Sequence, residues 1–410
     1  MKKFFALLLS LAMVLALVAC GQKDPTPDTP DTPDDPQTKV EYKVAMITDY
    51  GDITDQSFNQ TTYEACKEFA EDNSIEFSYF KPAGDNTADR VAMIEKAVDE
   101  GFNVIVMPGY AFGGAIVEAA PEFPDVKFIA LDVAAGDLLE TAVAKAGEAY
   151  DYTPENWDLN KYVDMSNVYC AVYQEELCGY MAGYAAVKLG YKNLGFLGGM
   201  SVPAVVRYGY GFVQGVDAAA ADLGLTDVKL NYIYGGQFFG DADITAVMDT
   251  WYQGGTEVVF ACGGGIYTSA VDAAKKVGAK VIGVDVDHAG VIANYAGVDG
   301  MTVTSAMKGL YPATYDTLTD VIVNGNWEKY VGKIETLGLV SGTDPEANYV
   351  QIPMGDGTQW SDSFTQDDYK AMVKDMFDGK ITVSNNTSSD VSAADFATVI
   401  TVDDQGSIKG

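Results

Sequence analysis

Acidic, hydroxyl and aromatic side chains crowd a short stretch near the start of the folded part of the chain. The segment TDYGDITDQSFNQ, residues 48–60, contains Asp49, Asp52, Asp55, Ser57, Phe58 and Asn59. Carboxylates this close together are suited to hold a metal ion, to act as acid and base, or to accept hydrogen bonds from a ligand. Calcium loops need oxygen ligands at alternate positions and a closing glutamate, which this segment lacks. The spacing therefore predicts no metal site.

Motifs for catalysis are also missing from the sequence. It contains no GxSxG turn, no Walker loop and no Cys/His couple, and its only histidine is His288. Asp132 and Asp285 could in principle form an acid–base pair, but no nucleophile motif accompanies them. The cysteines other than Cys20 show no CxxC spacing and are expected as small buried residues. We therefore predict no catalytic residue, no cofactor and no enzyme activity.

A binding role uses more of these residues. Asp132 and Asp285 each end an apolar run, FIALDV and VIGVDV respectively. A carboxylate can accept two hydrogen bonds from a vicinal diol such as a ribose, so one aspartate from each half of the chain could clasp a sugar. Phe58 and either Phe238 or Phe239 would supply aromatic faces. Each residue also has an ordinary structural alternative, because strand-end aspartates often cap helices and phenylalanines often fill cores.

Alternating strands and helices must position these side chains. From Tyr42 onward, apolar runs such as YKVAMIT, NVIVMPG and KFIALDV alternate with segments of helical periodicity, and the alternation restarts after a less regular insert at 147–167. Continuous apolar strands joined by helices predict parallel sheets covered on both faces, and two such arrays predict two α/β lobes. Ser57 and Gln60 have the S-x-x-Q spacing of a capping box, which would start the first helix.

Ligands of open parallel sheets bind beyond the carboxyl ends of the strands. In this sequence those ends are occupied by Asp49, Gly109, Asp132, Gly198, Gly199, Phe238, Phe239, Gly263, Gly264, Gly265 and Asp285. The glycine stretches GGMSVP and CGGGIYTS both leave a strand and enter a helix, which would let the backbone approach a ligand closely. We expect these residues to converge on one cleft between the lobes.

The N-terminal residues predict export. Residues 1–19 place two lysines before an apolar run, which is typical of a signal peptide, and LVAC ending at Cys20 matches a lipobox, so Cys20 is the predicted lipidation site. Residues 20–40, rich in Pro and Asp, predict a disordered tether. The formal net charge of −33 disfavours nucleic acid as a partner. These features predict an extracytoplasmic protein anchored to the cell membrane through its lipid.

Taken together, the motifs resemble the basic membrane protein family of substrate-binding lipoproteins, the purine-nucleoside receptors of ABC importers. The resemblance is carried by VAMITDYGDITDQSFNQTTYEA, FIALDV, EELCGYMAGYAA, NLGFLGGMSVPAVVRYGYGFVQGV, FACGGG, VIGVDVD, TSAMKG and MFDGKITV, which extend from Val44 to Val383. It implies the type I periplasmic-binding-protein fold, an α/β architecture in which two Rossmann-like lobes with parallel sheets are joined by a hinge and close on the ligand.

The resemblance also implies roles for individual residues. The implied ligand-binding set is Asp49, Ser57, Phe58, Asn59, Asp132, Phe238, Phe239, Gly263, Asp285 and Lys308. Within it, Asp285 corresponds to the acid expected on the ribose hydroxyls, and Phe238 and Phe239 are equally eligible as the second stacking ring. The segment between Asp285 and Lys308, the insert at 148–161 and the tail after 385 depart from the family pattern, which leaves the preferred base open.

These inferences combine into one prediction. A first lobe at 41–166, completed by part of 288–325, and a second lobe at 167–287, completed by part of 326–410, capture a purine nucleoside. The protein, a monomer, delivers it to the permease and ATPase subunits of an ABC importer. Two alternatives stay open: the same fold binding a pentose or another small polar ligand, and a surface nucleoside hydrolase.

Overall fold

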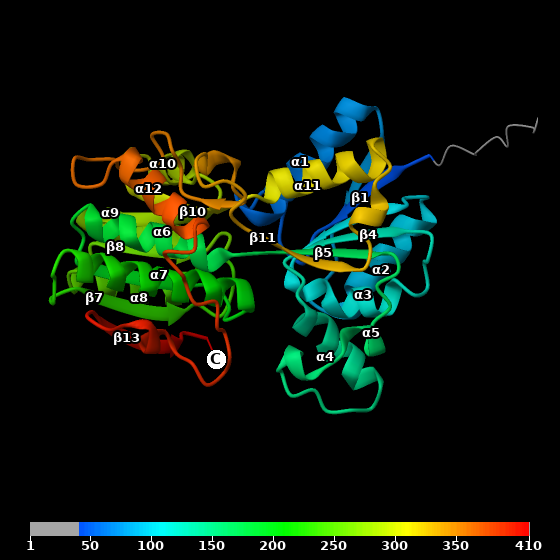
Figure 1. The fold of residues 1–410 in the computed structure, drawn as a ribbon, viewed down its shortest axis with the longest axis horizontal. Coiled ribbons are helices and arrows are strands. Elements are labelled where there is room, and N and C mark those ends of the chain that lie inside the picture. The colour runs from blue at the N-terminus through cyan, green and yellow to red at the C-terminus, as the bar shows by residue number, and fades with distance from the viewer. Residues whose placement is uncertain (1–40, 410) are drawn as a thin grey trace, which may run out of the picture. The chain divides into compact units, whose positions relative to one another are not determined.

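Two largely parallel sheets organise the chain (Figure 1). The computed structural model describes residues 41–409. The predicted signal peptide at 1–19, the lipidated Cys20 and the tether at 20–40 lie outside the described residues. Helices alternate with strands along both sheets, which confirms the α/β fold class predicted from the apolar periodicity.

The first sheet has six parallel strands in the order β11-β5-β4-β3-β1-β2. These strands are β1 (Lys43–Ile47), β2 (Glu76–Phe80), β3 (Val104–Pro108), β4 (Lys127–Leu131), β5 (Val168–Tyr173) and β11 (Lys333–Leu337). The helices of this lobe are α1 (Phe58–Asn73), α2 (Thr87–Asp99), α3 (Gly113–Ala119), α4 (Ala135–Lys145), α5 (Leu159–Tyr162) and α11 (Leu310–Leu318). The late helix α11, yellow in Figure 1, lies beside the early helix α1.

The second sheet has seven strands in the order β12-β10-β9-β8-β6-β7-β13, of which only β12 is antiparallel to its neighbour. These strands are β6 (Asn193–Gly198), β7 (Lys229–Tyr234), β8 (Val258–Cys262), β9 (Lys280–Asp285), β10 (Thr302–Lys308), β12 (Val350–Gln351) and β13 (Thr401–Ser407). The helices are α6 (Glu175–Lys188), α7 (Pro203–Asp222), α8 (Ala242–Gln253), α9 (Tyr267–Val277), α10 (Ala289–Ala296) and α12 (Gln366–Phe377).

The strand pairing divides the chain at different points from those predicted. Strand β5 pairs with β4 and β11 in the first sheet, so the first lobe continues to Tyr173 instead of ending at 166. Strand β10 belongs to the second sheet and β11 to the first, so the chain changes lobe after β5, after β10 and after β11. The prediction assigns only part of 288–325 and part of 326–410 to the lobes they complete, and these segments also contain β10 of the second sheet and β11 of the first, respectively.

Helices α6 and α7 pack closely through glycines. A Cβ added at Gly211 would lie 2.1 Å from the backbone oxygen of Glu176, and one at Gly179 would lie 2.3 Å from that of Tyr208. Larger side chains at these positions would force the helices apart, since real Cβ atoms do not approach other heavy atoms so closely. This contact fixes the start of α6 next to Tyr208 and Gly211 of α7. Among the helices of the described residues, none is long and apolar enough to cross a membrane.

Candidate functional site

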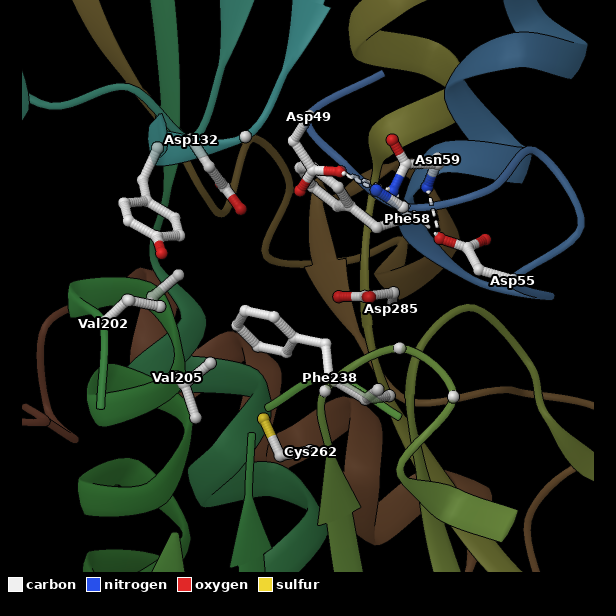
Figure 2. Close-up of a pocket in the computed structure, with 18 of the residues that line it drawn as sticks. Asp49, Asp55, Phe58, Asn59, Asp132, Val202, Val205, Phe238, Cys262 and Asp285 are labelled. Carbon is white, nitrogen blue, oxygen red and sulfur yellow. Dashed lines mark hydrogen bonds between the residues drawn. The ribbon is translucent and has the colours of Figure 1, made fainter. Parts of the chain in front are cut away.

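A cavity of about 410 Å³ is lined by residues of both lobes (Figure 2). Its volume lies within the range of small-molecule sites, about 300–1,000 Å³. Of the predicted ligand-binding residues, those that line it are Asp49, Phe58, Asn59, Asp132, Phe238, Phe239, Gly263, Asp285 and Lys308. Ser57 is not in the cavity wall; it is fully buried behind it. The structure thus brings residues separated by up to 259 positions, from Asp49 to Lys308, to one place.

Asp49 is held in place by the loop that follows it. Its Oδ1 accepts hydrogen bonds from the backbone N–H groups of Tyr50 at 2.6 Å and Gly51 at 2.7 Å, and from Asn59 Nδ2 at 3.3 Å. Burial raises the pKa of the Asp49 carboxyl, and these hydrogen bonds oppose the rise. A Cβ at Gly51 would lie 2.4 Å from Asn59 Nδ2, so this glycine lets the loop fold tightly over the Asn59 amide.

Asp55 starts helix α1, and the capping box predicted for Ser57 and Gln60 is wrong. Asp55 Oδ1 accepts from the backbone N–H groups of Ser57 at 2.9 Å and Gln60 at 3.0 Å, and its Oδ2 accepts from that of Asn59 at 2.9 Å. One carboxylate therefore satisfies the donors at the helix start. The Ser57 side chain makes no cap bond, since its Oγ donates to Asp285 instead.

The two strand-end aspartates adopt the same unusual backbone conformation. Asp132, which follows β4, has φ 59°, and Asp285, which ends β9, has φ 66°. Residues other than glycine rarely adopt positive φ, and aspartate is among the few that tolerate it. This conformation turns the chain sharply at the end of the strand. The similar runs FIALDV and VIGVDV therefore end in the same backbone conformation, at equivalent positions of the two lobes.

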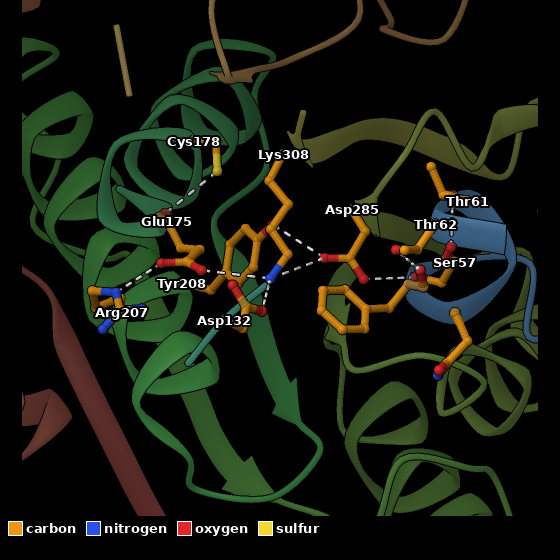
Figure 3. A network of polar contacts seen from close by, with 12 residues as sticks. Ser57, Thr61, Thr62, Asp132, Glu175, Cys178, Arg207, Tyr208, Asp285 and Lys308 are labelled. Carbon is orange, nitrogen blue, oxygen red and sulfur yellow. Dashed lines mark hydrogen bonds and ion pairs between the residues drawn. The ribbon is translucent and has the colours of Figure 1, made fainter. Parts of the chain in front are cut away.

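Lys308 stands at the centre of a buried ionic network (Figure 3). Its Nζ lies 2.5 Å from Asp132 Oδ2, 3.4 Å from Glu175 Oε1 and 3.8 Å from Asp285 Oδ1. Arg207 Nε in turn donates to Glu175 Oε2 at 2.7 Å. Burial alone would lower the pKa of Lys308, but the surrounding carboxylates outweigh it and hold the pKa above its ordinary value. The lysine is therefore a permanent cation.

Asp285 and Asp132 accept their partners differently. Ser57 Oγ donates to Asp285 Oδ2 at 2.6 Å and Tyr208 OH donates to Oδ1 at 3.3 Å, so both oxygens of Asp285 are engaged. Asp132 Oδ1 has no hydrogen-bond partner among the described residues, although it is buried. Burial raises the pKa of Asp132 to about 6, in opposition to the Lys308 charge. The Oδ1 atom of Asp132 therefore remains available to accept a hydrogen bond.

Phe238 and Phe239 have distinct positions. The Phe239 side chain is 57% exposed, whereas Phe238 is half-buried and points into the cavity (Figure 2). Added Cβ atoms at Gly199 and Gly263 would lie 2.4 Å and 2.9 Å from the Phe238 ring. These two glycines create the space that the ring occupies. Phe238 is thus the better placed of the two to stack on a ligand.

His288 connects the lobes beside the cavity. Its Nε2 lies 2.9 Å from the backbone oxygen of Gln56, which precedes α1 in the first lobe. With Nε2 assigned as the donor, Nδ1 has no partner among the described residues. Burial lowers the pKa of the imidazole. In the part of the chain that the structure describes, no group of three or more His, Cys, Asp or Glu side chains could hold a metal ion.

Sequence reasoning missed several residues of this site. They are Glu175, Arg207 and Tyr208 of the polar network, and Asp137, Val202 and Val205 of the cavity wall. A signal for Arg207 was present, because it is the only charged residue in the apolar run PAVVRYGYGFVQGV. Burial raises the pKa of Asp137 to about 7, and its Oδ2 accepts from the backbone N–H of Ala134 at 2.7 Å.

Comparisons with known proteins agree with this architecture. Residues 42–343 match the model of the Bmp family, described as "ABC transporter substrate-binding protein PnrA-like". The ABC transporter nucleoside-binding protein BmpA of Lactococcus lactis subsp. cremoris is 25% identical over 392 residues, which cover 92% of this chain and 96% of that protein. An uncharacterized lipoprotein of Pyrococcus abyssi is 25% identical over 320 residues, or 74% of this chain and 69% of that protein.

A solved structure supports the fold independently of sequence. An ABC transporter solute-binding protein from Aeropyrum pernix K1 superposes with a TM-score of 0.59 at 19% identity, covering 83% of this chain and 87% of that one. The match confirms the predicted type I periplasmic-binding-protein fold. Because the family model spans most of the described residues and its description agrees with the two-lobed cavity, the chain belongs to the Bmp family of ABC transporter substrate-binding proteins.

Proposed function

We propose that the protein is an extracytoplasmic lipoprotein that captures a purine nucleoside between its lobes and delivers it to the permease and ATPase subunits of an ABC importer. The observation that carries this proposal is that one cavity is lined by aromatic rings from both lobes and by an ionic group, which meet where Lys308 Nζ lies 4.8 Å from the centroid of the Phe58 ring. Phe58 from the first lobe and Phe238 from the second line the aromatic part, while Asp132, Asp285 and Lys308 line the ionic part. A nucleoside has the same two parts, a flat base and a polar sugar.

The aromatic part suits a heterocyclic base. Phe58 and Phe238 enter from different lobes, so a base that stacks on both would hold the lobes together. Each aromatic contact is worth about 0.5–1.5 kcal/mol beyond its burial. Asp49 and Asn59 lie at the same end of the cavity, with Asn59 Oδ1 buried and without a partner among the described residues. These carboxylate and amide groups match the hydrogen-bonding edge of a purine.

The ionic part suits ribose. The unused Oδ1 of Asp132 can accept a hydroxyl hydrogen, and the carboxylate of Asp285 faces the same cavity from the other lobe. A buried acceptor without a partner costs about 1–3 kcal/mol, which a sugar hydroxyl would recover. Lys308 Nζ lies 2.5 Å from Asp132 Oδ2 and 3.8 Å from Asp285 Oδ1 and so holds the two carboxylates close together. The arrangement needs no nucleophile, which fits capture of an intact ligand.

Cys20 and the preceding signal-like segment supply the proposed anchor, and the lipoprotein relative supports this assignment. The nucleoside-binding relative supports the ligand class. Closure of the lobes would shield the nucleoside from water and present one shape to the permease. We propose a monomer in which the binding set is that predicted above, with Phe238 as the second ring and with Ser57 acting only through Asp285.

Calorimetry with inosine, adenosine, uridine, free purine bases and D-ribose tests this function. We expect the purine nucleosides to bind more tightly than uridine and far more tightly than the base or the sugar alone, since only the nucleoside occupies both parts of the cavity. Chromatography of the recovered ligand should show intact nucleoside. Ribose binding as tight as inosine binding would show a pentose receptor, and release of free base would show a hydrolase.

A further inference from the structure

The loop that carries Phe238 contacts a distant part of the chain. This ring loop, residues 235–241, joins β7 to α8. At its start, Gly235 N–H donates to the Gly198 oxygen at 2.7 Å and Gly236 N–H donates to the Gly199 oxygen at 3.0 Å. These bonds hold the first two residues only. Farther along, Phe239 forms an isolated β-bridge with Gly265 and the Asp241 N–H donates to Ser269 Oγ at 3.0 Å, so what remains to be held next to Phe238 is Gln237.

Strand β13 delivers Lys409 to that loop. It pairs in parallel with β7, and after the last paired residues Ile408 N–H donates to the Tyr234 oxygen at 2.8 Å. Because paired parallel strands end at the same edge of a sheet, β13 must end where β7 ends, at the ligand-binding edge. A Cβ at Gly236, which has φ +80°, would lie 2.6 Å from the Lys409 backbone oxygen, so the two segments touch through their backbones.

The Lys409 side chain joins the two ends of the ring loop. Its Nζ donates to Gln237 Oε1 at 3.0 Å and forms an ion pair with Asp241. Gln237 Nε2 in turn donates to the Phe239 backbone oxygen at 2.9 Å and to Asp241 Oδ2 at 2.9 Å. Asp241 is also fixed, as the N-cap of α8. These contacts therefore hold residues on both sides of Phe238 in the sequence: Gln237 before it, and Phe239 and Asp241 after it.

The segment around β13 has its own attachment to the second lobe. Asp217 Oδ1 accepts from the backbone N–H groups of Thr398 and Val399 at 2.8 Å and of Ile400 at 3.2 Å. Trp251 Nε1 donates to Gln405 Oε1 at 3.2 Å. None of these bonds involves the ring loop. The strand can therefore act as a fixed support, and it lies beyond residue 343, where the match to the family model ends.

We propose that Lys409 is a positioning residue that holds the Phe238 ring in its stacking orientation through Gln237 and Asp241. The choice of inosine as the test ligand rests on the function proposed above. The claim that Lys409 holds the ring loop does not rest on it. Without the Lys409 ammonium, Gln237 and Asp241 lose a shared donor and the ring loop gains alternative conformations. Because Lys409 and Asp241 are partly exposed, we expect inosine binding to weaken only about three- to tenfold, chiefly through faster dissociation.

The test compares wild-type protein with Lys409→Met, Lys409→Arg and a matched control, Lys192→Met. The Lys192 side chain is about as exposed as that of Lys409 and forms an ion pair with Asp227 at 3.0 Å, before β6 and far along the strand from the cavity. Inosine affinity is measured by calorimetry, and exchange of the amides of residues 235–241 is measured by hydrogen–deuterium exchange in the absence of ligand. A Phe238→Ala background with and without Lys409→Met completes a double-mutant cycle.

The proposal expects Lys409→Met to weaken inosine binding and to speed exchange in the ring loop, with Lys409→Arg close to wild type and Lys192→Met unchanged. In the Phe238→Ala background, Lys409→Met should add no further loss. An additive loss in that background, or unchanged loop exchange in Lys409→Met, would overturn it. If wild-type protein binds no nucleoside while Lys409→Met still loosens the loop, the proposed function fails and the support of the ring loop stands.

Discussion

The two lobes hold their parts of the cavity wall in different ways. In the first lobe, Asp49, Asp55 and Asn59 lie within one short segment and fix one another by hydrogen bonds. In the second lobe, the Phe238 ring is placed by Gly199 and Gly263, which come from other strand–helix loops. The first lobe thus builds the wall around Asp49 from one segment, whereas the second builds the wall around Phe238 from segments far apart in the sequence. Local sequence can therefore specify the former far better than the latter.

Asp285 contacts residues of both lobes, so its removal should have the largest effect on ligand affinity. Asp285→Ala would remove the partner of Ser57 Oγ in the first lobe and of Tyr208 OH in the second. Loss of a buried, hydrogen-bonded carboxylate should weaken nucleoside binding about 100-fold or more. Calorimetry with inosine measures the loss, while circular dichroism checks the fold. Unchanged affinity would show that Asp285 does not bind the ribose.

The glycine packing of the second lobe is tested by Gly199→Ala. The added Cβ would lie 2.4 Å from the Phe238 ring and displace it from the cavity, so inosine affinity should fall about tenfold. Gly290→Ala is the matched control, since a Cβ there meets no heavy atom within 4 Å. If both variants bind inosine like wild type, the position of the Phe238 ring does not contribute to affinity.

The self-contained loop of the first lobe is tested by Asp55→Ala. This change would leave the start of α1 without its cap and should lower the free energy of unfolding by about 1–2 kcal/mol. Asp52→Ala, in the same loop, removes an exposed pair with Lys81 and should cost about 0.5 kcal/mol or less. Urea denaturation distinguishes the two, and equal losses would contradict the capping role of Asp55.

The same contrast explains what could be predicted from the sequence. Periodicity is local, so the strands, the helices and the cluster around Asp49 and Phe58 followed from it. The role of Ser57 did not, because the partner of its Oγ is Asp285, 228 residues away. The choice between Phe238 and Phe239 depends on space left by glycines in other loops.

The pairing of strands within each sheet could not be predicted from the sequence for a related reason. The run VYCAVY of β5 does not reveal which sheet it joins, and the predicted lobe boundary at 166 lies before it. Glu175 was missed because acidic residues are common in the first turn of a helix, and the isolated charge of Arg207 gains its meaning only from the contact with Glu175. Pairing between distant segments is set by the packed three-dimensional structure, which no single segment contains.

The contact between His288 and Gln56 joins the two lobes and should make stability depend on pH. Burial lowers the pKa of folded His288 below its ordinary 6.5, whereas an unfolded chain takes up the proton near that value. As the pH falls from about 6.5 toward the lower folded pKa, the unfolded state binds more protons and the free energy of unfolding decreases, by at most about 1.4 kcal/mol per pH unit. Above this window, His288 contributes no pH dependence.

Other groups titrate in the same range with the opposite sign. Burial raises the pKa values of Asp137 and Glu176 to about 7, so protonation of these carboxyls stabilises the folded state as the pH falls. The difference between wild type and His288→Gln removes this shared background. Urea denaturation from pH 8 to pH 5 should show the variant gaining stability relative to wild type only below about pH 6.5. Parallel curves throughout would mean that the imidazole is protonated equally in both states, and that its burial between the lobes carries no energetic cost.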